Sequence, residues 1–287
     1  MILPPLRLTA AFAFTTLSAG LTLVPVSALY AETPSTSQID STDWLYAGTD
    51  IPRDTGWQFG TLANGLRYAV RNNGSPPGQV SIRVRIDAGS LMESDSERGF
   101  AHFLEHLSFR GSRLLGDGDT KRIWQRLGAT FGSDTNASTT PTATVYKLDL
   151  PSATAAGLDE GMKTLAAMIE APNLDASTID SERGVVLSEL RENAGPQARV
   201  SDAIHEHIFA GQRLADRVPI GTEQSLGAAT PEGLARFHQR WYRPDNVVIA
   251  IAGDGDPATF AKLIERYFGG WKAEGVRPSA PDFGTPQ

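Results

Sequence analysis

Two histidines and a glutamate stand close together in the segment His102-Phe103-Leu104-Glu105-His106. If residues 99–110 form a helix, the two imidazoles lie one turn apart on one face, and Glu105 lies next to that face. Two neutral imidazoles at this spacing can bind one zinc ion and leave positions for a third ligand and a water molecule. A carboxylate beside them can accept a proton from that water. The segment therefore predicts a metal site that activates water.

The order H-x-x-E-H inverts the zinc motif H-E-x-x-H and is the inverzincin signature. An alternative is that both histidines belong to the core, because Phe103, Leu104 and Leu107 in the same segment are apolar. A pair of histidines four residues apart, with a glutamate beside them, favours the metal over that alternative.

A third ligand is expected from a later predicted helix, which carries several glutamates. Glu182 and Glu189 are seven residues apart and share one helical face, and Glu192 follows about one turn later. A carboxylate would partly neutralise the metal and complete three protein ligands. Spacing alone does not choose among these glutamates, although Glu192 is more simply interpreted as a solvated charge.

The composition excludes several classes of protein. The chain has 287 residues, of which 40% are hydrophobic and 21% charged, as in an ordinary globular protein. Its formal net charge of -7 argues against a nucleic-acid-binding protein, which would usually carry a basic face. Because the chain has no cysteine, it has no disulfides, and a metal site must use His, Asp and Glu.

Residues 1–31 are typical of a secretory signal peptide. Arg7 precedes an apolar run over residues 8–24, and small residues suited to cleavage follow at Val26-Ser27-Ala28 and at Ala31. A membrane anchor is the alternative, but threonines, Ser18 and Gly20 weaken the run as a stable span. We therefore expect a periplasmic or secreted protein with no stable membrane span after removal of the signal.

The remaining sequence predicts one folded domain between two irregular segments. Residues 32–56 are polar and predict a flexible N-terminal segment. A zinc-bearing domain is predicted over residues 57–272. Residues 273–287 are rich in Pro and Gly and predict a linker. Asn64-Gly65 predicts a hairpin. Residues 80–87 alternate between apolar and polar side chains, which favours an antiparallel sheet covered on one side. Helices are predicted over 121–127 and 156–170 and at the starts Thr230-Pro231 and Asp256-Pro257, with strands over 142–150 and 246–252.

The segment from Phe131 to Thr139 is polar and predicts a solvated loop or an edge strand. An edge strand has unpaired backbone groups, so an extended peptide could add to it. His205 and His207 are two residues apart and point to different faces of a predicted helix, so we interpret them as surface residues.

Several blocks of this sequence resemble the pitrilysin/insulinase-type zinc metallopeptidases, which include the mitochondrial processing peptidases. The resemblance covers about residues 57–272 and follows the family's order. Its blocks are Asn64-Gly65-Leu66-Arg67, the metal segment from Gly99 to Ser112, Asn136-Ala137 with Thr144 and Tyr146, Glu182-Arg183 to Glu189-Leu190, Pro219-Ile220-Gly221-Thr222 and Trp241-Tyr242-Arg243-Pro244.

The resemblance assigns a role to each candidate residue. It implies that His102, His106 and Glu189 bind zinc, that Glu105 is the general base, and that Glu182 is a supporting acid near the site. The residues expected to pair with substrate backbone are Ser133, Asn136 and Ala137. The activity implied is the hydrolysis of peptide bonds in extended peptides or unfolded proteins by a zinc-activated water.

The implied fold is α+β, an antiparallel sheet with helices packed on it, forming one half of a two-half clamshell. The second half would follow residues 273–287 in a longer chain or come from a partner subunit. We expect the chain alone to bind Zn²⁺ but to hydrolyse peptides poorly. The alternatives are a non-catalytic subunit that binds peptides or stabilises a partner, and a zinc enzyme with a non-peptide substrate.

Overall fold

The computed structural model describes residue 44, residues 46–47 and residues 49–287. The predicted signal peptide at residues 1–31, and the part of the predicted flexible segment up to residue 43, lie outside the described residues. Residues 46–287 belong to one structural unit, whose first strand begins at Gln58. Within the described part of the chain, no helix is both long and apolar enough to cross a membrane.

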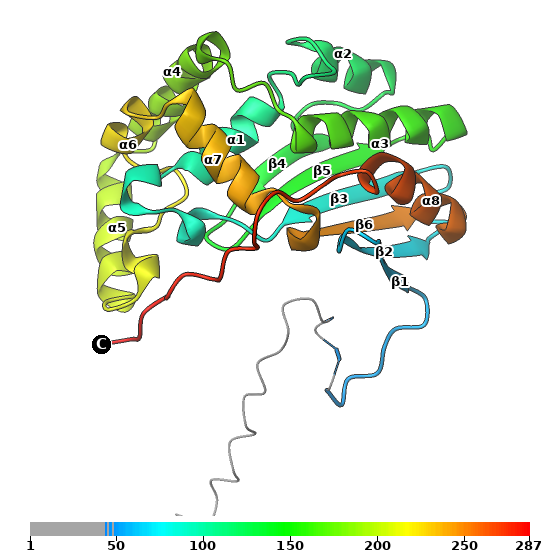
Figure 1. Cartoon of the computed structure of the whole chain (residues 1–287), viewed down its shortest axis with the longest axis horizontal. Coiled ribbons are helices and arrows are strands. Elements are labelled where there is room, and N and C mark those ends of the chain that lie inside the picture. The colour runs from blue at the N-terminus through cyan, green and yellow to red at the C-terminus, as the bar shows by residue number, and fades with distance from the viewer. Residues whose placement is uncertain (1–43, 45, 48) are drawn as a thin grey trace, which may run out of the picture. The chain divides into compact units, whose positions relative to one another are not determined.

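Six strands form one sheet in the order β1-β2-β6-β3-β5-β4 (Figure 1). The antiparallel prediction is confirmed for four neighbouring pairs, but β2 and β6 run parallel. Side chains alternate with a period of two in parallel and antiparallel ladders alike, so the alternation within a strand does not show that β2 and β6 run in the same direction. The strands are β1 (Gln58–Thr61), β2 (Arg67–Asn72), β3 (Val80–Ile86), β4 (Thr135–Thr139), β5 (Thr144–Leu150) and β6 (Val247–Gly253).

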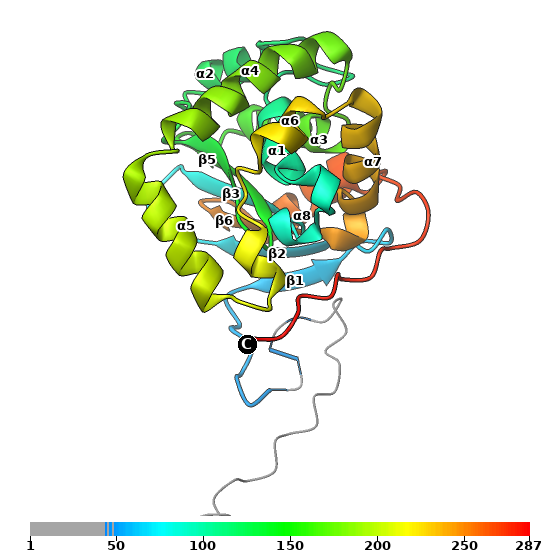
Figure 2. The ribbon, with the colours of Figure 1, turned by 90° about the vertical axis from the view of Figure 1, so that its left-hand side faces the viewer.

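Helices cover one face of this sheet, as the two perpendicular views show (Figure 1, Figure 2). In β3 every second side chain, from Val80 to Ile86, is buried under them, as the alternation predicted. The helices are α1 (Phe100–Ser108), α2 (Asp119–Arg126), α3 (Ala155–Glu170), α4 (Ala176–Glu192), α5 (Pro196–Ile208), α6 (Glu223–Gly227), α7 (Pro231–Trp241) and α8 (Pro257–Phe268).

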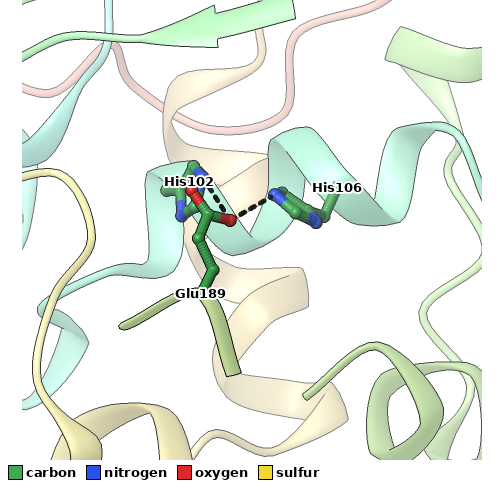
Figure 3. Close-up of side chains that lie close together, drawn as sticks. All are labelled: His102, His106 and Glu189. Atoms are coloured by element: carbon green, nitrogen blue, oxygen red, sulfur yellow. Dashed lines mark ion pairs between the residues drawn. The ribbon is translucent and has the colours of Figure 1, made fainter. Parts of the chain in front are cut away.

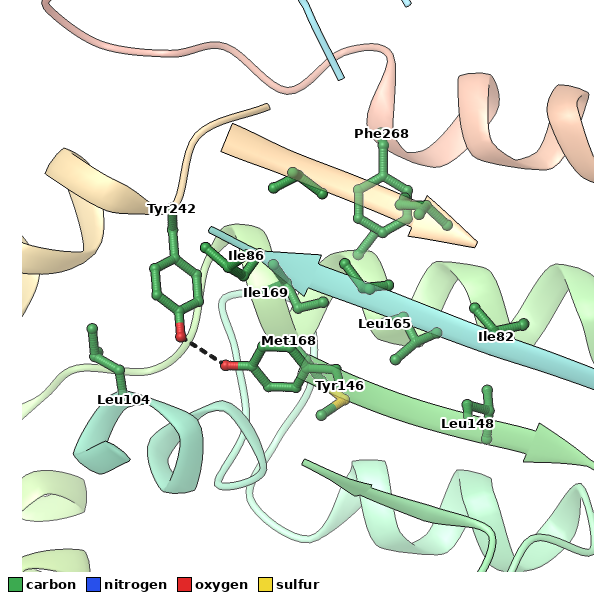
Figure 4. Packing of buried hydrophobic residues seen from close by; sticks show 14 of the residues in the cluster. Ile82, Ile86, Leu104, Tyr146, Leu148, Leu165, Met168, Ile169, Tyr242 and Phe268 are labelled. Carbon is green, nitrogen blue, oxygen red and sulfur yellow. Dashed lines mark hydrogen bonds between the residues drawn. The ribbon is translucent and has the colours of Figure 1, made fainter. Parts of the chain in front are cut away.

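The core lies between the sheet and the helices (Figure 4). Ile82 and Leu148 of the sheet pack there with Leu165 of α3 and Phe268 of α8, all at most 1% exposed. Tyr146 of β5 carries a polar group into this apolar layer. Its hydroxyl lies 2.9 Å from the Ser108 hydroxyl and 3.0 Å from that of Tyr242, so a chain of hydrogen bonds joins α1, the sheet and the end of α7.

Residues 273–287 contain no helix or strand but contact the rest of the unit. The Arg213 backbone N–H donates to the Phe283 carbonyl at 2.7 Å, and that of Gln287 donates to the Ala210 carbonyl at 3.1 Å. The Arg243 guanidinium donates to the Glu274 carbonyl at 2.8 Å. The role of this segment as a linker stays a prediction.

A buried carboxylate holds the start of α1. Glu93 is fully buried, and its two oxygens accept hydrogen bonds from the backbone N–H groups of Gly99 and Ala101, both at 2.9 Å. Gly99 has a φ of 93°, in the left-handed region that favours glycine. A Cβ at Gly99 would lie 3.0 Å from the Cα of Gly221, so the loop after Ile220 lies directly against this helix end.

Glu93 should make the stability of the metal-free protein depend on pH. Burial raises the pKa of its carboxyl to about 8 from the ordinary 4.5, although the two backbone N–H groups and Arg217 lower it. Between these values the unfolded chain has lost a proton that the native protein keeps. The free energy of unfolding should therefore fall as pH rises, by up to about 1.4 kcal/mol per pH unit from this group.

Glu93→Gln has no such proton to lose and should remove that slope. Urea denaturation in the presence of a chelator, at pH values from about 5 to 8, measures the effect. Glu97→Gln is the matched control, because contacts with Arg240 outweigh burial and lower the pKa of Glu97, so it does not titrate in this range. A Glu93→Gln protein with the same slope as the unmodified chain would contradict this account.

Candidate metal centre

The short helix α1 presents two imidazoles to the same point in space (Figure 3). Phe103, Leu104 and Leu107 are completely buried and hold the helix against the core. His102 and His106 therefore share the opposite, partly buried side. Their ring centroids lie 4.6 Å apart, with the ring planes at 76°.

Glu189 reaches the histidines from α4 and is the glutamate that the structure brings to both. Its Oε2 lies 3.8 Å from Nε2 of His102 and 3.5 Å from Nε2 of His106. Each of the three residues offers a ligand atom within 4.8 Å of the others. The exposed Glu192 does not belong to this group. Spacing in the sequence had left the choice among the glutamates of this helix open.

These separations suit a metal ion better than direct hydrogen bonds. Both exceed the usual length of an N–H···O bond. Ligand atoms bound at about 2.0–2.2 Å to a tetrahedral zinc ion lie about 3.3–3.6 Å from each other. The two distances from Glu189 are close to that range, so the three side chains fit one small divalent cation.

Glu182 faces the other nitrogen of His106. Its Oε1 lies 2.9 Å from Nδ1 of His106, and its Oε2 accepts from Arg110 at 2.5 Å. Burial opposes the charge on Glu182, but the hydrogen bonds to His106 and Arg110 outweigh it and lower the pKa of the carboxyl. A carboxylate on Nδ1 selects the tautomer with a proton there, which leaves the Nε2 lone pair free for a metal.

The electrostatic surroundings of the two imidazoles differ. Burial, together with the neighbouring His106, lowers the pKa of His102 to about 4, so this ring is neutral at neutral pH. For His106, burial also opposes the charge, but Glu182 outweighs it and the pKa is raised. Nδ1 of His102 is buried and has no hydrogen-bond partner among the described residues. Only His106 is therefore held by a carboxylate at its Nδ1.

Glu105 lies beside the histidines and is only 8% exposed. Its Oε2 accepts a hydrogen bond of 2.5 Å from the hydroxyl of Thr139 on β4. Burial raises the pKa of this carboxyl, and the hydrogen bond from Thr139 offsets only part of the effect. Such a carboxylate is a stronger proton acceptor than an ordinary exposed glutamate.

A cleft of about 430 Å³ opens onto these side chains. We call it the histidine cleft, and its lining residues come from α1, the edge strand β4, the C-terminal end of α4 with the residue that follows it, and the loop before α6. They are His102, Glu105, His106, Asn136, Ala137, Ser138, Thr139, Glu189, Asn193, Pro219 and Ile220.

Strand β4 forms one edge of the sheet, so the edge-strand interpretation of this segment is correct. Asn136 and Ala137 line the histidine cleft, but the exposed Ser133 precedes the strand and does not line it. The backbone carbonyl of Ser133 instead accepts from Lys147 at 2.7 Å. Ser138 and Thr139 also line this cleft, although they were not among the residues that the sequence singled out for substrate contact.

Arg110 was also missed, although a signal for it exists in the sequence. It follows His106 by four residues, so a helix continuing through this point would place it on the same face. Glu93 gave no such signal, because its contact with α1 depends on the loop that precedes the helix.

The sequence is similar to known protein families and to individual proteins. The sequence model of the insulinase family (Peptidase family M16) matches residues 68–219, and that of the Peptidase M16 inactive domain matches residues 228–287. The probable zinc protease PqqL of Escherichia coli is 34% identical over 215 residues, which are 75% of this chain and 23% of that protein. The β subunit of the mitochondrial-processing peptidase of Caenorhabditis elegans is 32% identical over 212 residues, 73% of this chain and 44% of that protein.

The fold agrees as well. The crystal structure of the first half of the periplasmic protease PqqL from Escherichia coli superposes with a TM-score of 0.76 at 32% identity, covering 81% of this chain and 50% of that one. This chain thus spans only a part of its curated relatives, 23% of the length of PqqL. Because the first family model matches more than half of the sequence, the chain belongs to the insulinase family, Peptidase family M16.

Proposed function

We propose that this chain is the zinc-bearing half of a metallopeptidase in which His102, His106 and Glu189 bind Zn²⁺. The observation that carries the proposal is the approach of Glu189 to both histidines at 3.5 and 3.8 Å. Two neutral imidazoles and one carboxylate are a common catalytic zinc set, because they leave a coordination position for water or substrate. Names such as probable zinc protease among the relatives support the same metal.

Glu105 is the proton acceptor of the proposed reaction. When bound, zinc supplies Lewis acidity that makes water a usable nucleophile near neutral pH. Glu105 takes the proton from the attacking water and can return it to the leaving amine. The Thr139 hydroxyl, at 2.5 Å, fixes the carboxylate on the side that faces the histidine cleft. Glu182 acts through His106, whose ring it orients.

The proposed substrate is an extended peptide that pairs with β4. The residues that flank this strand fix the phase of its pairing with β5: the Asp149 N–H donates to the Asp134 carbonyl just before β4, and the Thr140 N–H just after it donates to the Ala143 carbonyl. Because antiparallel pairs alternate, Ala137 and Thr139 direct their backbone groups away from β5. These groups can bind the backbone of a peptide lying in the histidine cleft. Ser133 is not part of this proposal, whereas Asn136 and Ala137 are.

We further propose that full activity needs a second half, in the same longer chain or in a partner subunit, and that the protein works in the periplasm or after secretion. The solved relative is described as the first half of a periplasmic protease, which supports both points. The non-catalytic alternative is disfavoured, because Glu105 stands beside the candidate ligands.

The experiment that tests the proposal separates zinc binding from hydrolysis. Glu105→Gln should bind zinc like the unmodified chain and lose at least about 100-fold in peptide cleavage, because it cannot accept a proton. Glu189→Gln should lose zinc affinity as well. Zinc is measured by competition with a chelator, and cleavage with a quenched peptide at enzyme concentrations above the substrate, since we expect slow turnover by the chain alone.

Glu192→Gln is the matched control, because Glu192 is exposed and lies on the same helix as Glu189. It should leave both zinc affinity and cleavage unchanged. If the unmodified chain binds no zinc, the proposed metal site is wrong. If Glu105→Gln cleaves at the rate of the unmodified chain, only the assignment of the base is wrong.

The edge strand can be tested separately at Ala137. Ala137→Pro removes one outward N–H group but none of the bonds from β4 to β5, and proline is tolerated on an exposed strand edge. Losing one peptide hydrogen bond should raise KM by about 3- to 10-fold without changing zinc affinity. Ala137→Ser keeps the N–H group and serves as the control. An unchanged KM in the proline variant would argue against backbone pairing at this position.

A further inference from the structure

One basic side chain connects to the candidate metal centre without touching the candidate ligand atoms. Arg110 lies just after α1, four residues beyond His106. Its Nη1 donates to Oε2 of Glu182 at 2.5 Å, while Oε1 of the same carboxylate lies 2.9 Å from Nδ1 of His106. Glu182 is thus held between a guanidinium and an imidazole, and it is only 6% exposed.

Asp117 fixes the far side of the same guanidinium. Nε of Arg110 donates to Oδ1 of Asp117 at 3.2 Å, and Nη2 donates to Oδ2 at 3.0 Å. This two-point contact suits the planar fork of arginine and sets its orientation. Nη1 also approaches the Ser181 hydroxyl at 3.5 Å. Because all three nitrogens of Arg110 donate to protein groups, this side chain is poorly placed to recognise a charged group of a substrate.

We propose that Arg110, held by Asp117, is a positioning residue that fixes the Glu182 carboxylate on His106 and thereby directs the Nε2 lone pair of His106 toward the metal. This inference rests on the zinc site proposed above. Lysine could not take over the role fully, because a single ammonium group does not supply the fork that spans Asp117 and Glu182.

The need for Arg110 follows from the surroundings of Glu182. A buried carboxylate with a single hydrogen-bond partner can rotate about its terminal torsion and turn its oxygen away from that partner. A second partner on the other oxygen fixes the positions of both oxygens. His102 has no comparable group at its Nδ1 among the described residues. Of the two imidazoles, His106 is therefore the one whose orientation can be set by a carboxylate at Nδ1.

A double-mutant cycle on zinc affinity tests the inference. Partners that orient metal-bound histidines typically contribute about 10- to 100-fold to metal affinity, and we expect a loss in this range for Glu182→Gln. Arg110→Gln should weaken zinc binding by about 10-fold in the unmodified chain, but by less than about 2-fold in the Glu182→Gln background, because Arg110 acts only through that carboxylate. Arg110→Lys should recover part of the loss.

Competition with a chelator gives the affinities, and urea denaturation of the metal-free variants checks the fold. Arg266→Gln is the matched control, since Arg266 forms an exposed ion pair with Asp159 at 2.7 Å and should not affect zinc. Should Arg110→Gln fail to fold, Asp117→Asn replaces it in the cycle, with a smaller loss that again disappears in the Glu182→Gln background.

The outcomes separate this inference from the proposed function. Zinc affinity that is unchanged in Arg110→Gln, or that falls equally in both backgrounds, overturns the role of Arg110 and leaves the zinc site in place. An unmodified chain that binds no zinc overturns both.

Discussion

The candidate metal centre depends on the burial of one short helix. Three side chains of α1, Phe103, Leu104 and Leu107, are completely buried, so the helix cannot turn about its axis without exposing them, at a cost of about 1.5–3 kcal/mol each. The same packing fixes the direction of His102 and His106. A site that needs two lone pairs aimed at one point requires this rigidity, since small displacements of a ligand weaken metal binding.

Burial of one face also holds helix α4, but the two glutamates on that face are not equally buried. Ile179, Glu182 and Val186 are buried, whereas Glu189 is partly exposed beyond them at the rim of the cleft. Two glutamates on one face of this helix thereby acquire different environments. Glu182 sits in the packed layer, where it contacts His106 and Arg110 and its pKa is lowered. Glu189 reaches into the cleft with its carboxylate close to both histidines. The two glutamates thus lie at different depths along one helix, Glu182 in contact with Nδ1 of His106 and Glu189 as a candidate ligand in the cleft.

The sequence predicted the parts of this arrangement that follow from local periodicity. The spacing of His102 and His106, and the shared face of Glu182 and Glu189, are properties of any α-helix. The choice of Glu189 depends on how α4 crosses α1, and that crossing is a tertiary contact with no local signal. The same limit applies to Ser133, which the sequence grouped with Asn136 and Ala137 although it precedes β4. Composition marks a polar segment but does not say where pairing with β5 begins, and the preceding turn extends the loop as far as Asp134.

The parallel pairing of β2 with β6 shows how far the site depends on distant sequence. The two family models divide the chain between residues 219 and 228, yet β6 from the second part lies between β2 and β3 of the first. Without β6 the sheet would separate into the β1–β2 hairpin and the strands β3, β5 and β4. Helix α7 also belongs to the second part, and its Phe237 packs edge-on against Phe100 of α1, with ring centroids 6.3 Å apart. The first part of the chain, which carries the histidines, Glu105 and Glu189, therefore cannot complete its own core. The geometry of the metal centre depends on β6 and α7, which supply none of its candidate ligands.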